Sequence, residues 1–397
     1  MKVTILTHTP EPEKTVAAAA RLCYSNISAS EIMENFSEEK ASSFIKKLMD
    51  MGHMSPVEHV SFTFAIDGVS RTLLAQLTRH RIASYSVQSL RYNNPFKGET
   101  VDPQKEAETK ARHRAYLEGL AFARNFCNKL DGSCADLVEK HDIKELLLEK
   151  ISKDLLSSYF RGIFDGAGIL EEGPDLSIAF PKHFDTVLNK SSFNITPDEE
   201  KILIKNEDAV NFCIYIYEDI DFISNSFCQE KLKALCQKSR KFYEFFLKTA
   251  ESYIDSRYYS TLPESIAGKP EAVLTYIKGL ESCKKNYLEL VKMGVDQEDA
   301  RYILPMGTQT RLVMTMNVRS LYNFFHLRCC QRAQSEIRQL ANLMLAEVKK
   351  IAPGLFEKAG APCEATGFCP EGKFSCGRYP VQKPEAQSRK TEVGSER

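Results

Sequence analysis

Residues 76–92 read QLTRHRIASYSVQSLRY, and this stretch holds four cationic or titratable side chains without one carboxylate. Arg79, His80 and Arg81 form an unbroken triplet, and Ser89 and Arg91 follow after mostly small or polar residues. Like charges at this spacing repel one another, so the stretch predicts an anionic ligand that completes it. A simpler interpretation stays open. The preceding residues 70–78 have leucines at helical spacing, and cations at a helix C-terminus are ordinary partners of the helix dipole.

The composition is that of an ordinary globular protein of two or three domains. The 397 residues include 53 Lys and Arg against 53 Asp and Glu, so the formal net charge is zero. This balance argues against bulk polyanion binding, and a nucleotide site must then be a local basic concentration such as residues 76–91. The N-terminal MKVTILTHTP resembles a strand rather than a signal peptide, and no apolar run approaches about 18 residues. We therefore expect a cytoplasmic protein without a membrane span, in which most of the twelve cysteines are reduced.

The segment before the cationic stretch alternates between apolar and small or polar side chains. Val60, Phe62, Phe64 and Ile66 follow this period of two, which predicts a half-buried strand over residues 60–66. A strand is also predicted at 2–8, and helices at 11–22 and 37–51. Polar side chains stand at the entrance of the 60–66 strand, namely His53, Ser55, Glu58 and His59. A lone histidine at such a place is more often a structural hydrogen-bonding residue.

A second polar constellation lies near the C-terminal end. A predicted strand ends at Asn317, and a long helix is predicted over 319–351. On that helix Arg319 and Asn323 share a face, whereas Arg328 points roughly to the opposite side. A helix with polar groups on both faces needs two ligands or a partner subunit. Alternatively, Arg328 and Arg332 are solvated surface charges.

Four motifs occur in a characteristic order: GHxSPxEH at residues 52–59, RHR-x7-S at 79–89, ARYILP at 300–305 and N-x-R-x3-N-x4-R at 317–328. Together they resemble the signatures of the flavin-dependent thymidylate synthases, which methylate dUMP using FAD, methylenetetrahydrofolate and NADPH. The resemblance covers about residues 1–97 and 263–352. It implies an α+β fold with helices packed around a central antiparallel or mixed sheet, and a homotetramer whose sites are shared between subunits.

The resemblance also implies roles for individual residues. Those that would contact FAD are His53, Ser55, Arg79, His80, Arg81, Asn317, Arg319 and Asn323. Those that would bind dUMP are Gln76, Arg79, Gln88, Ser89, Arg91, Arg301 and Arg328. Arg328 and Ser89 would be the catalytic residues, with Arg328 favouring the uracil that is ionised at N3 and Ser89 positioning the substrate. Val87 departs from the family pattern, which often has Glu or Gln two residues before the serine. No metal is expected.

Residues 98–262 look like an inserted, mainly helical domain between two catalytic parts, 1–97 and 263–352. Helices are predicted at 103–130, 142–165, 207–223 and 228–256. The motif YFRGIFDGAGIL, residues 159–170, weakly resembles a LAGLIDADG homing-endonuclease-like domain. The position expected to hold its metal-binding acid is Ala167, so this resemblance implies a module without cleavage activity. An unrelated helical insertion is the alternative.

The segment 353–397 forms a cysteine-containing tail, and its last part, from Val381, is predicted to be disordered. Cys363, Cys369 and Cys376 do not have the spacing of a zinc CxxC pair, and a fourth ligand would have to come from elsewhere. Two other functions stay open for the whole chain. One is a nucleotide- or flavin-binding regulator without catalysis. The other is a nucleic-acid-binding protein that works through the insertion, against which the mixed charge of residues 98–262 argues.

Overall fold

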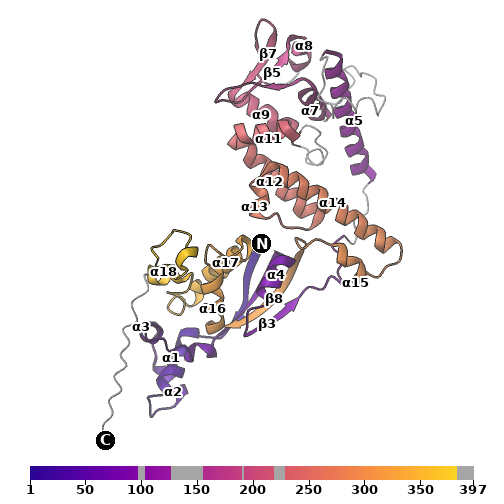
Figure 1. The fold of residues 1–397 in the computed structure, drawn as a ribbon. Helices are drawn as coiled ribbons and strands as arrows, with labels where there is room; N and C mark the ends of the chain where they lie inside the picture. Colours follow the sequence, from indigo (N-terminus) through magenta and orange to yellow (C-terminus); the bar gives the residue numbers. More distant parts are fainter. Residues whose placement is uncertain (97–102, 127–154, 190–191, 219–228, 382–397) are drawn as a thin grey trace. The chain divides into compact units, whose positions relative to one another are not determined.

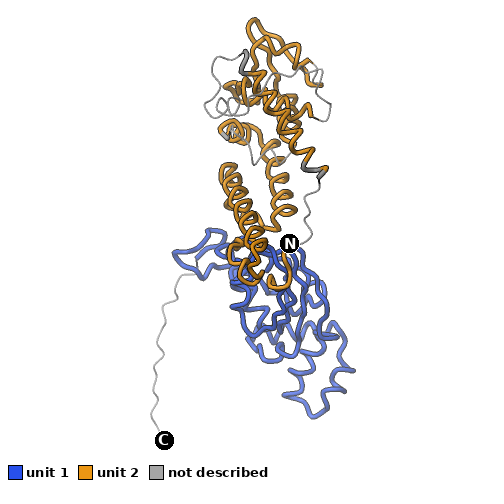
Figure 2. Tube along the Cα trace, turned by 90° about the vertical axis from the view of Figure 1, so that its right-hand side faces the viewer, with its two compact units in different colours: residues 1–88, 309–397 blue, residues 89–308 orange. Residues whose placement is uncertain are grey.

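The computed structural model divides the chain into two compact units. It describes residues 1–96, 103–126, 155–189, 192–218 and 229–381. Unit 1 consists of residues 1–88 and 309–397, and unit 2 of residues 89–308 (Figure 2). These limits differ from the sequence-based boundaries at 97/98 and 262/263. The interpretation of residues 98–262 as an insertion into a catalytic domain stays a prediction.

Unit 1 is built on a four-stranded antiparallel sheet in the order β1-β2-β8-β3. Two of these strands, β3 and β8, are labelled in Figure 1. The strands are β1 (Lys2–His8), β2 (Ser61–Ser70), β3 (Ala83–Val87) and β8 (Gln309–Asn317). Phe62, Phe64 and Ile66 of β2 are fully buried, which confirms the predicted alternation. Phe64 lies opposite Met314 of β8, so the centre of the sheet joins parts of the chain that are distant in sequence.

Helices cover this sheet and complete an α+β unit, so the predicted fold class is confirmed. They are α1 (Pro12–Leu22), α2 (Ala29–Asn35), α3 (Glu38–Asp50), the 3-10 helix η1 (Pro56–His59), α4 (Arg71–Leu77), α16 (Val318–Arg328) and α17 (Ser335–Ile351). α1 and α3 agree with the predicted helices 11–22 and 37–51. Their buried side chains share one core with Phe62 and Phe64 of the sheet.

The predicted continuous helix over residues 319–351 is wrong. α16 ends at Arg328, and α17 begins at Ser335. The break is stabilised by Gln334, whose side chain accepts a hydrogen bond from the backbone N–H of Ile337 and caps the second helix. Because no proline or glycine marks the break, helical periodicity alone could not locate it.

The C-terminal segment packs onto unit 1 as far as Val381. Phe356 contacts Phe62 edge to face, with the ring centroids 5.6 Å apart. Glu357 pairs with Lys46 at 2.8 Å. The short helices α18 (Pro362–Thr366) and η6 (Gly372–Phe374) follow. The predicted disorder concerns residues 381–397, and apart from Val381, which bridges to Cys369, these lie outside the described residues.

Unit 2 contains most of the helices. They are α5 (Pro103–Phe126), α7 (Leu156–Ala167), η4 (Lys182–Phe184), α8 (Asp185–Leu188), α9 (Asn206–Ile216), α11 (Gln229–Lys238), α12 (Arg240–Tyr258), α13 (Glu264–Ala267), α14 (Pro270–Lys292), α15 (Gln297–Ala300) and η5 (Arg301–Ile303). The predicted helix 228–256 is divided at Ser239, whose side chain caps α12 through the N–H of Phe242. Parts of the predicted helices 103–130, 142–165 and 207–223 lie outside the described residues.

A second sheet that the sequence did not predict belongs to unit 2. Its strands are β4 (Ile169–Leu170), β5 (Ser177–Pro181), β6 (Thr196–Pro197) and β7 (Lys201–Lys205), in the antiparallel order β4-β5-β7-β6. Unit 2 therefore contains a sheet in addition to its helices. The strand segments SIAFP and KILIK are short apolar runs, and such runs cannot be assigned to a strand or a buried helix by periodicity.

The helices α5 and α7 cross at two glycines. A Cβ atom added to Gly119 would lie 2.1 Å from the carbonyl oxygen of Tyr159, and one added to Gly162 would lie 2.1 Å from that of Tyr116. The relation is reciprocal, because each glycine faces the backbone of the other helix. Only residues without a side chain allow two helices to approach this closely.

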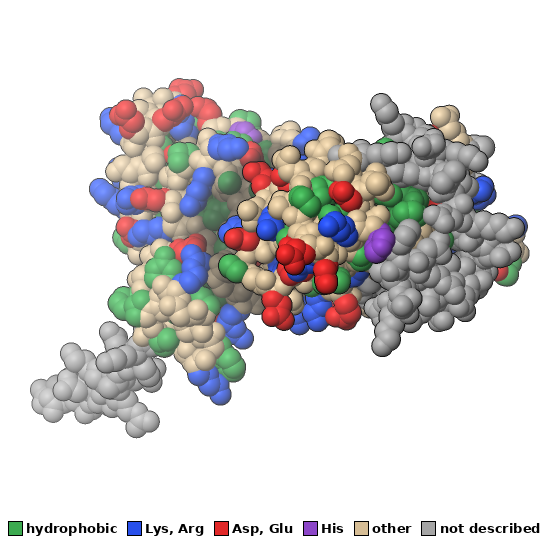
Figure 3. All heavy atoms as spheres, turned by 90° about the horizontal axis from the view of Figure 1, so that it is seen from above, with side chains coloured by type: hydrophobic (Ala, Val, Ile, Leu, Met, Phe, Trp, Pro, Cys, Tyr) green, Lys and Arg blue, Asp and Glu red, His purple; other side chains and the backbone are tan. Residues whose placement is uncertain are grey.

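Acidic and basic side chains are interspersed on the face drawn in Figure 3, in keeping with the equal numbers of the two kinds in the sequence. Within the described residues, no helix combines the length and the apolar character that crossing a membrane requires.

Candidate active site

The cationic triplet lies in the turn between α4 and β3 in unit 1. At the start of α4, Ser70 caps the helix through the N–H of Leu73, and its own N–H donates to the Glu336 carboxylate of α17 at 2.7 Å. At the end of α4, the Tyr85 hydroxyl of β3 donates to the carbonyl oxygens of Leu77 at 2.8 Å and His80 at 3.0 Å. The turn is thus tied to both neighbouring elements, which fixes the backbone of the triplet.

The three side chains of the triplet do not share an environment. Arg79 and Arg81 are exposed, whereas His80 is only 6% exposed. No carboxylate among the described residues pairs with either arginine. Two uncompensated charges therefore remain on the surface of this turn, as the interpretation of the stretch as an anion site requires.

His80 is joined to Arg328, the last residue of α16. The Nε of Arg328 donates to Nε2 of His80 at 2.9 Å, and its Nη1 approaches Oε1 of Gln76 at 3.5 Å. The His80 ring also meets Phe324 edge to face at 5.0 Å between the ring centroids. Both polar partners of the half-buried Arg328 are neutral, and no described carboxylate pairs with it. The arrangement therefore orients a guanidinium without cancelling its charge.

The electrostatics of His80 agree with this geometry. Burial, followed by the nearby charge of Arg328, lowers the pKa of His80 to about 4 from its ordinary 6.5. The imidazole is therefore neutral at physiological pH. Tyr85 beside it is affected in the opposite direction, because burial raises its pKa to about 12, so its hydroxyl remains protonated and can donate.

The start of α16 is close to the same turn. The Asn317 side chain caps α16 through the N–H of Ser320 at 2.8 Å, and the Ser320 hydroxyl accepts from the N–H of Ile82 at 3.2 Å. Arg319 forms an ion pair with Glu58 of η1. The structure thereby brings the RHR turn, the α16 segment and the GHxSPxEH segment onto neighbouring elements of unit 1.

The other predicted cofactor residues of unit 1 lie on the surface near these elements. His53 and Ser55 are exposed in the segment that leads into η1, and Asn323 is exposed on α16. The predicted nucleotide residue Gln88 is half-buried at the end of β3, where its carbonyl oxygen accepts from Arg71 at 3.0 Å. Their roles as cofactor and nucleotide contacts stay predictions.

Unit 2 brings together two predicted nucleotide-binding arginines that are distant in sequence. The Nε of Arg91 pairs with the Glu298 carboxylate at 2.8 Å. Arg301 donates to the carbonyl oxygen of Glu298 at 2.9 Å, and a second nitrogen of its guanidinium lies 3.8 Å from the Glu298 carboxylate. Two guanidiniums around one carboxylate form a cluster that can also take a phosphate.

Ser89 lies beside this cluster in sequence, and its hydroxyl oxygen accepts a hydrogen bond from the N–H of Arg91 at 3.2 Å. Its carbonyl oxygen accepts from the backbone and the side chain of Asn93. Among the described residues, no histidine or carboxylate hydrogen-bonds to the Ser89 hydroxyl. The serine therefore has the surroundings of a turn residue that can contact a ligand, rather than those of an activated nucleophile.

Sequence reasoning gave no role to several residues that the structure places at these sites. They are Glu58, Tyr85, Phe324 and Glu298. A signal existed for Glu298, because an acid three residues before Arg301 is spaced to meet it on one helical turn. No comparable signal exists for Tyr85, whose partners are backbone carbonyl groups.

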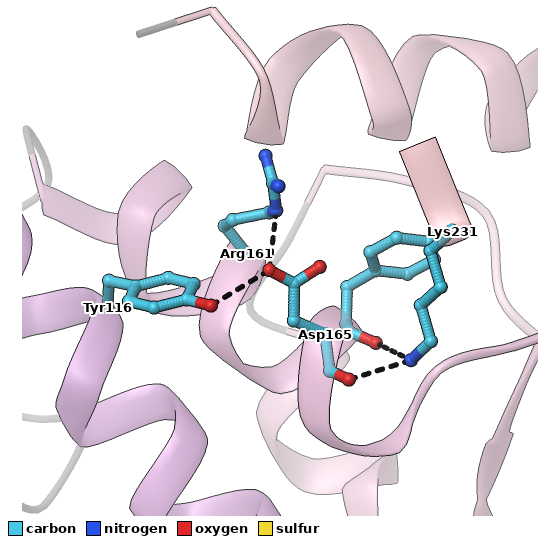
Figure 4. Close-up of polar contacts among 5 residues, drawn as sticks. Tyr116, Arg161, Asp165 and Lys231 are labelled. Carbon is cyan, nitrogen blue, oxygen red and sulfur yellow. Dashed lines mark hydrogen bonds and ion pairs between the residues drawn. The ribbon is translucent and has the colours of Figure 1, made fainter. Parts of the chain in front are cut away.

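The glycine-rich motif of unit 2, residues 159–170, makes contacts that stabilise the fold. Figure 4 shows the Tyr116 hydroxyl and the Arg161 guanidinium meeting the same carboxylate oxygen of Asp165. The Asp165 carboxylate lies 3.0 Å from Nε of Arg161 and accepts from the Tyr116 hydroxyl at 2.9 Å. Lys231 caps the end of α7 through the carbonyl oxygens of Phe164 and Asp165. The only acid of the motif is thus engaged in a buried network, and Ala167 supplies no metal ligand.

The cysteines of the tail lie apart from these contacts. Cys363 and Cys369 are buried and Cys376 is exposed. Burial raises the pKa of the Cys363 thiol. In the described part of the chain, no three His, Cys, Asp or Glu side chains are grouped so that they could hold a metal ion.

Comparisons with known proteins place the chain in a family. The family model described as thymidylate synthase complementing protein matches residues 4–157 and 236–354. The flavin-dependent thymidylate synthase of Clostridium tetani is 32% identical over 383 residues, which cover 96% of each chain. That of Geobacter sulfurreducens is 29% identical over 378 residues, covering 95% of this chain and 94% of the relative. Both alignments include the middle part of this chain.

A solved structure was also found. The flavin-dependent thymidylate synthase ThyX of Helicobacter pylori, complexed with FAD and dUMP, is 16% identical with a TM-score of 0.37, and the match covers 91% of this chain and all of that one. The assignment depends instead on the family model, which matches more than half of the chain, and on the relative of similar length from Clostridium tetani. On these two matches, the chain belongs to the flavin-dependent thymidylate synthase family.

Proposed function

We propose that this chain converts dUMP to dTMP by reductive methylation, using methylenetetrahydrofolate as the carbon donor and FAD that is reduced by NADPH. The observation that carries the proposal is that Arg328 is held by neutral hydrogen-bonding partners and by no described carboxylate. Its polar partners, His80 and Gln76, are both neutral, so its full charge is available to an anionic ligand. A half-buried, oriented guanidinium is suited to a uracil that carries negative charge in the reaction.

The chain's own residues would prepare the nucleotide as follows. Arg328 would stabilise the uracil that has lost its N3 proton, which raises the electron density at C5. Arg91 and Arg301 would bind the phosphate, which would replace part of their interaction with the Glu298 carboxylate. Gln76, Gln88 and Ser89 would complete the polar contacts. In this role Ser89 orients the substrate, in keeping with its turn-like hydrogen bonds.

The residues of unit 1 fit a dinucleotide cofactor. Arg79 and Arg81 are exposed and lack carboxylate partners among the described residues, which suits a diphosphate. The N-terminus of α16 adds a positive helix end beside Arg319 and Asn323. His53, Ser55 and Asn317 would contribute further contacts. When bound and reduced, FAD supplies the hydride for the transfer.

We further propose that the enzyme works in the cytoplasm as a homotetramer, with each active site formed by more than one subunit. Support for shared sites comes from the polar groups that α16 offers: Arg319 and Asn323 are exposed, while Arg328 is engaged with His80. The mass of the particle in solution, measured by light scattering, tests the assembly. A monomer that turns over dUMP would contradict it.

The absorption spectrum of the purified protein tests the proposed cofactor. We expect flavin bands, either at once or after the protein is mixed with FAD and desalted, and a change in these bands when dUMP is added. A protein that retains FAD and binds dUMP but forms no dTMP would support the regulatory alternative. A protein that retains no flavin but binds DNA through residues 98–262 would support the nucleic-acid alternative.

A further inference from the structure

We propose that His80 is a positioning residue: it accepts a hydrogen bond from the Arg328 guanidinium and fixes the orientation in which Arg328 meets the substrate anion. The inference rests on the proposed role of Arg328. It differs from the role that the family resemblance implies for His80, which is direct contact with FAD.

The contact determines the tautomer of the imidazole. Arginine has only donors, so Nε2 of His80, 2.9 Å from Nε of Arg328, must be an acceptor. The ring proton then resides on Nδ1. A doubly protonated imidazole could not accept this bond and would repel the guanidinium. The hydrogen bond therefore exists only while His80 is neutral.

The surroundings of His80 hold its ring in place. The backbone N–H of His80 donates to the Leu77 carbonyl oxygen at 3.0 Å, and the backbone carbonyl oxygen of His80 accepts from the Tyr85 hydroxyl. Phe324 packs edge to face against the ring. By contrast, Arg328 ends α16 with a long side chain that has several rotatable bonds. A fixed acceptor at Nε removes most of this freedom before the substrate arrives.

The choice of neutral acceptors matters for the substrate. A carboxylate in the place of His80 or Gln76 would also orient Arg328, but it would neutralise the charge that an anionic substrate needs. A histidine kept neutral by burial orients the guanidinium without this loss. His80 therefore acts on the substrate through Arg328 and does not itself touch the reacting atoms.

A double-mutant cycle tests the inference. The variants are His80→Leu, His80→Gln, Arg328→Ala and the double variant His80→Leu/Arg328→Ala. The matched control is His326→Gln, which replaces an exposed histidine on the same helix α16. Leucine fills the site but accepts no hydrogen bond, whereas the side-chain oxygen of glutamine can replace Nε2.

We expect His80→Leu to lower kcat/KM for dUMP by about 10- to 100-fold, while the FAD dissociation constant stays within about twofold of wild type. In the Arg328→Ala background the same change should have no further effect, because the residue through which His80 acts is absent. His80→Gln should recover most of the activity, and His326→Gln should retain the wild-type value. A weaker FAD affinity that His80→Leu causes equally in both backgrounds would overturn the inference and support direct contact with the cofactor.

Crystal structures of the wild-type protein and of His80→Leu provide a readout that is independent of activity. We expect the Arg328 guanidinium to leave its wild-type position in the variant. An unchanged Arg328 side chain would overturn the inference. If the wild-type enzyme forms no dTMP, the proposed function fails, and the position of Arg328 in these two structures still decides the role of His80.

Discussion

Replacing His80 by glutamine should change how the stability of this protein depends on pH. In the folded protein, burial and the Arg328 charge lower the pKa of His80 to about 4, whereas its ordinary value is 6.5. As the pH falls through 6.5, the unfolded chain binds a proton that the folded chain does not. Unfolding is favoured increasingly until the folded imidazole is protonated near pH 4. The stability that depends on a neutral His80 is therefore complete above pH 6.5. As the pH falls from 6.5 to 4, the free energy of unfolding decreases.

The size of the effect follows from these two values. Between pH 7.5 and pH 5, the difference in proton binding removes about 2 kcal/mol from the free energy of unfolding. Two charged or titratable groups on the packed elements lie near His80. Arg328 of α16 adds to the pKa shift, and the Tyr85 hydroxyl of β3 contacts His80 at its backbone carbonyl oxygen rather than at the ring. The neighbouring Arg79 and Arg81 are exposed. Glutamine does not titrate, so the variant should lack this part of the pH dependence.

Urea denaturation followed by circular dichroism at pH 7.5 and pH 5 measures the effect. Between the two pH values, wild type should lose about 2 kcal/mol more stability than His80→Gln. We expect His326→Gln, the exposed control on α16, to keep the wild-type pH dependence. If wild type and His80→Gln lose the same stability, His80 is not held neutral, and the hydrogen bond from Arg328 cannot have the form described above.

Three further predictions concern the nucleotide contacts and the fold of unit 2. Arg328→Ala should weaken dUMP binding by about 1.5–3 kcal/mol, or roughly 10- to 150-fold, at unchanged flavin content; an equal loss of flavin would assign Arg328 to the cofactor. Ser89→Ala should retain measurable dTMP formation, and a complete loss with intact dUMP binding would indicate a nucleophilic serine. Gly162→Ala should lower the stability of unit 2 by about 1–3 kcal/mol, because the added Cβ would overlap the Tyr116 carbonyl group. Its control, Gly279→Ala on α14, places the Cβ in open space and should stabilise unit 2 by up to about 1 kcal/mol. Thermal melts that change alike in these two variants would show that the α5–α7 crossing is not close.

The sequence predicted those features of the fold that depend on local pattern. The alternation from Val60 to Ile66 identified the central strand, and acids in the first turn with alanines behind them identified α1. The break between α16 and α17 depends on one side-chain cap by Gln334, which periodicity does not register. The strands β5 and β7 were missed because five apolar or mixed residues satisfy more than one secondary structure.

For the site, the motifs were more informative than any single residue. They identified the flavin-dependent thymidylate synthase family and with it the enzyme class, and the comparisons confirm these. They also named Arg91 and Arg301, which the structure brings to one carboxylate. They could not reveal that His80 faces Arg328 or that Tyr85 holds the turn. Such contacts depend on the tertiary fold, and the spacing of the residues along the sequence does not predict them.

The most direct test of the proposed function is the formation of dTMP in a single anaerobic turnover. The purified protein is loaded with FAD, reduced, and mixed with dUMP and methylenetetrahydrofolate, and the nucleotides are separated after quenching. We predict that about one dTMP forms per reduced flavin and that the flavin is oxidised at the same time. Flavin that stays reduced, with dUMP recovered unchanged, would contradict the proposal that this chain methylates dUMP.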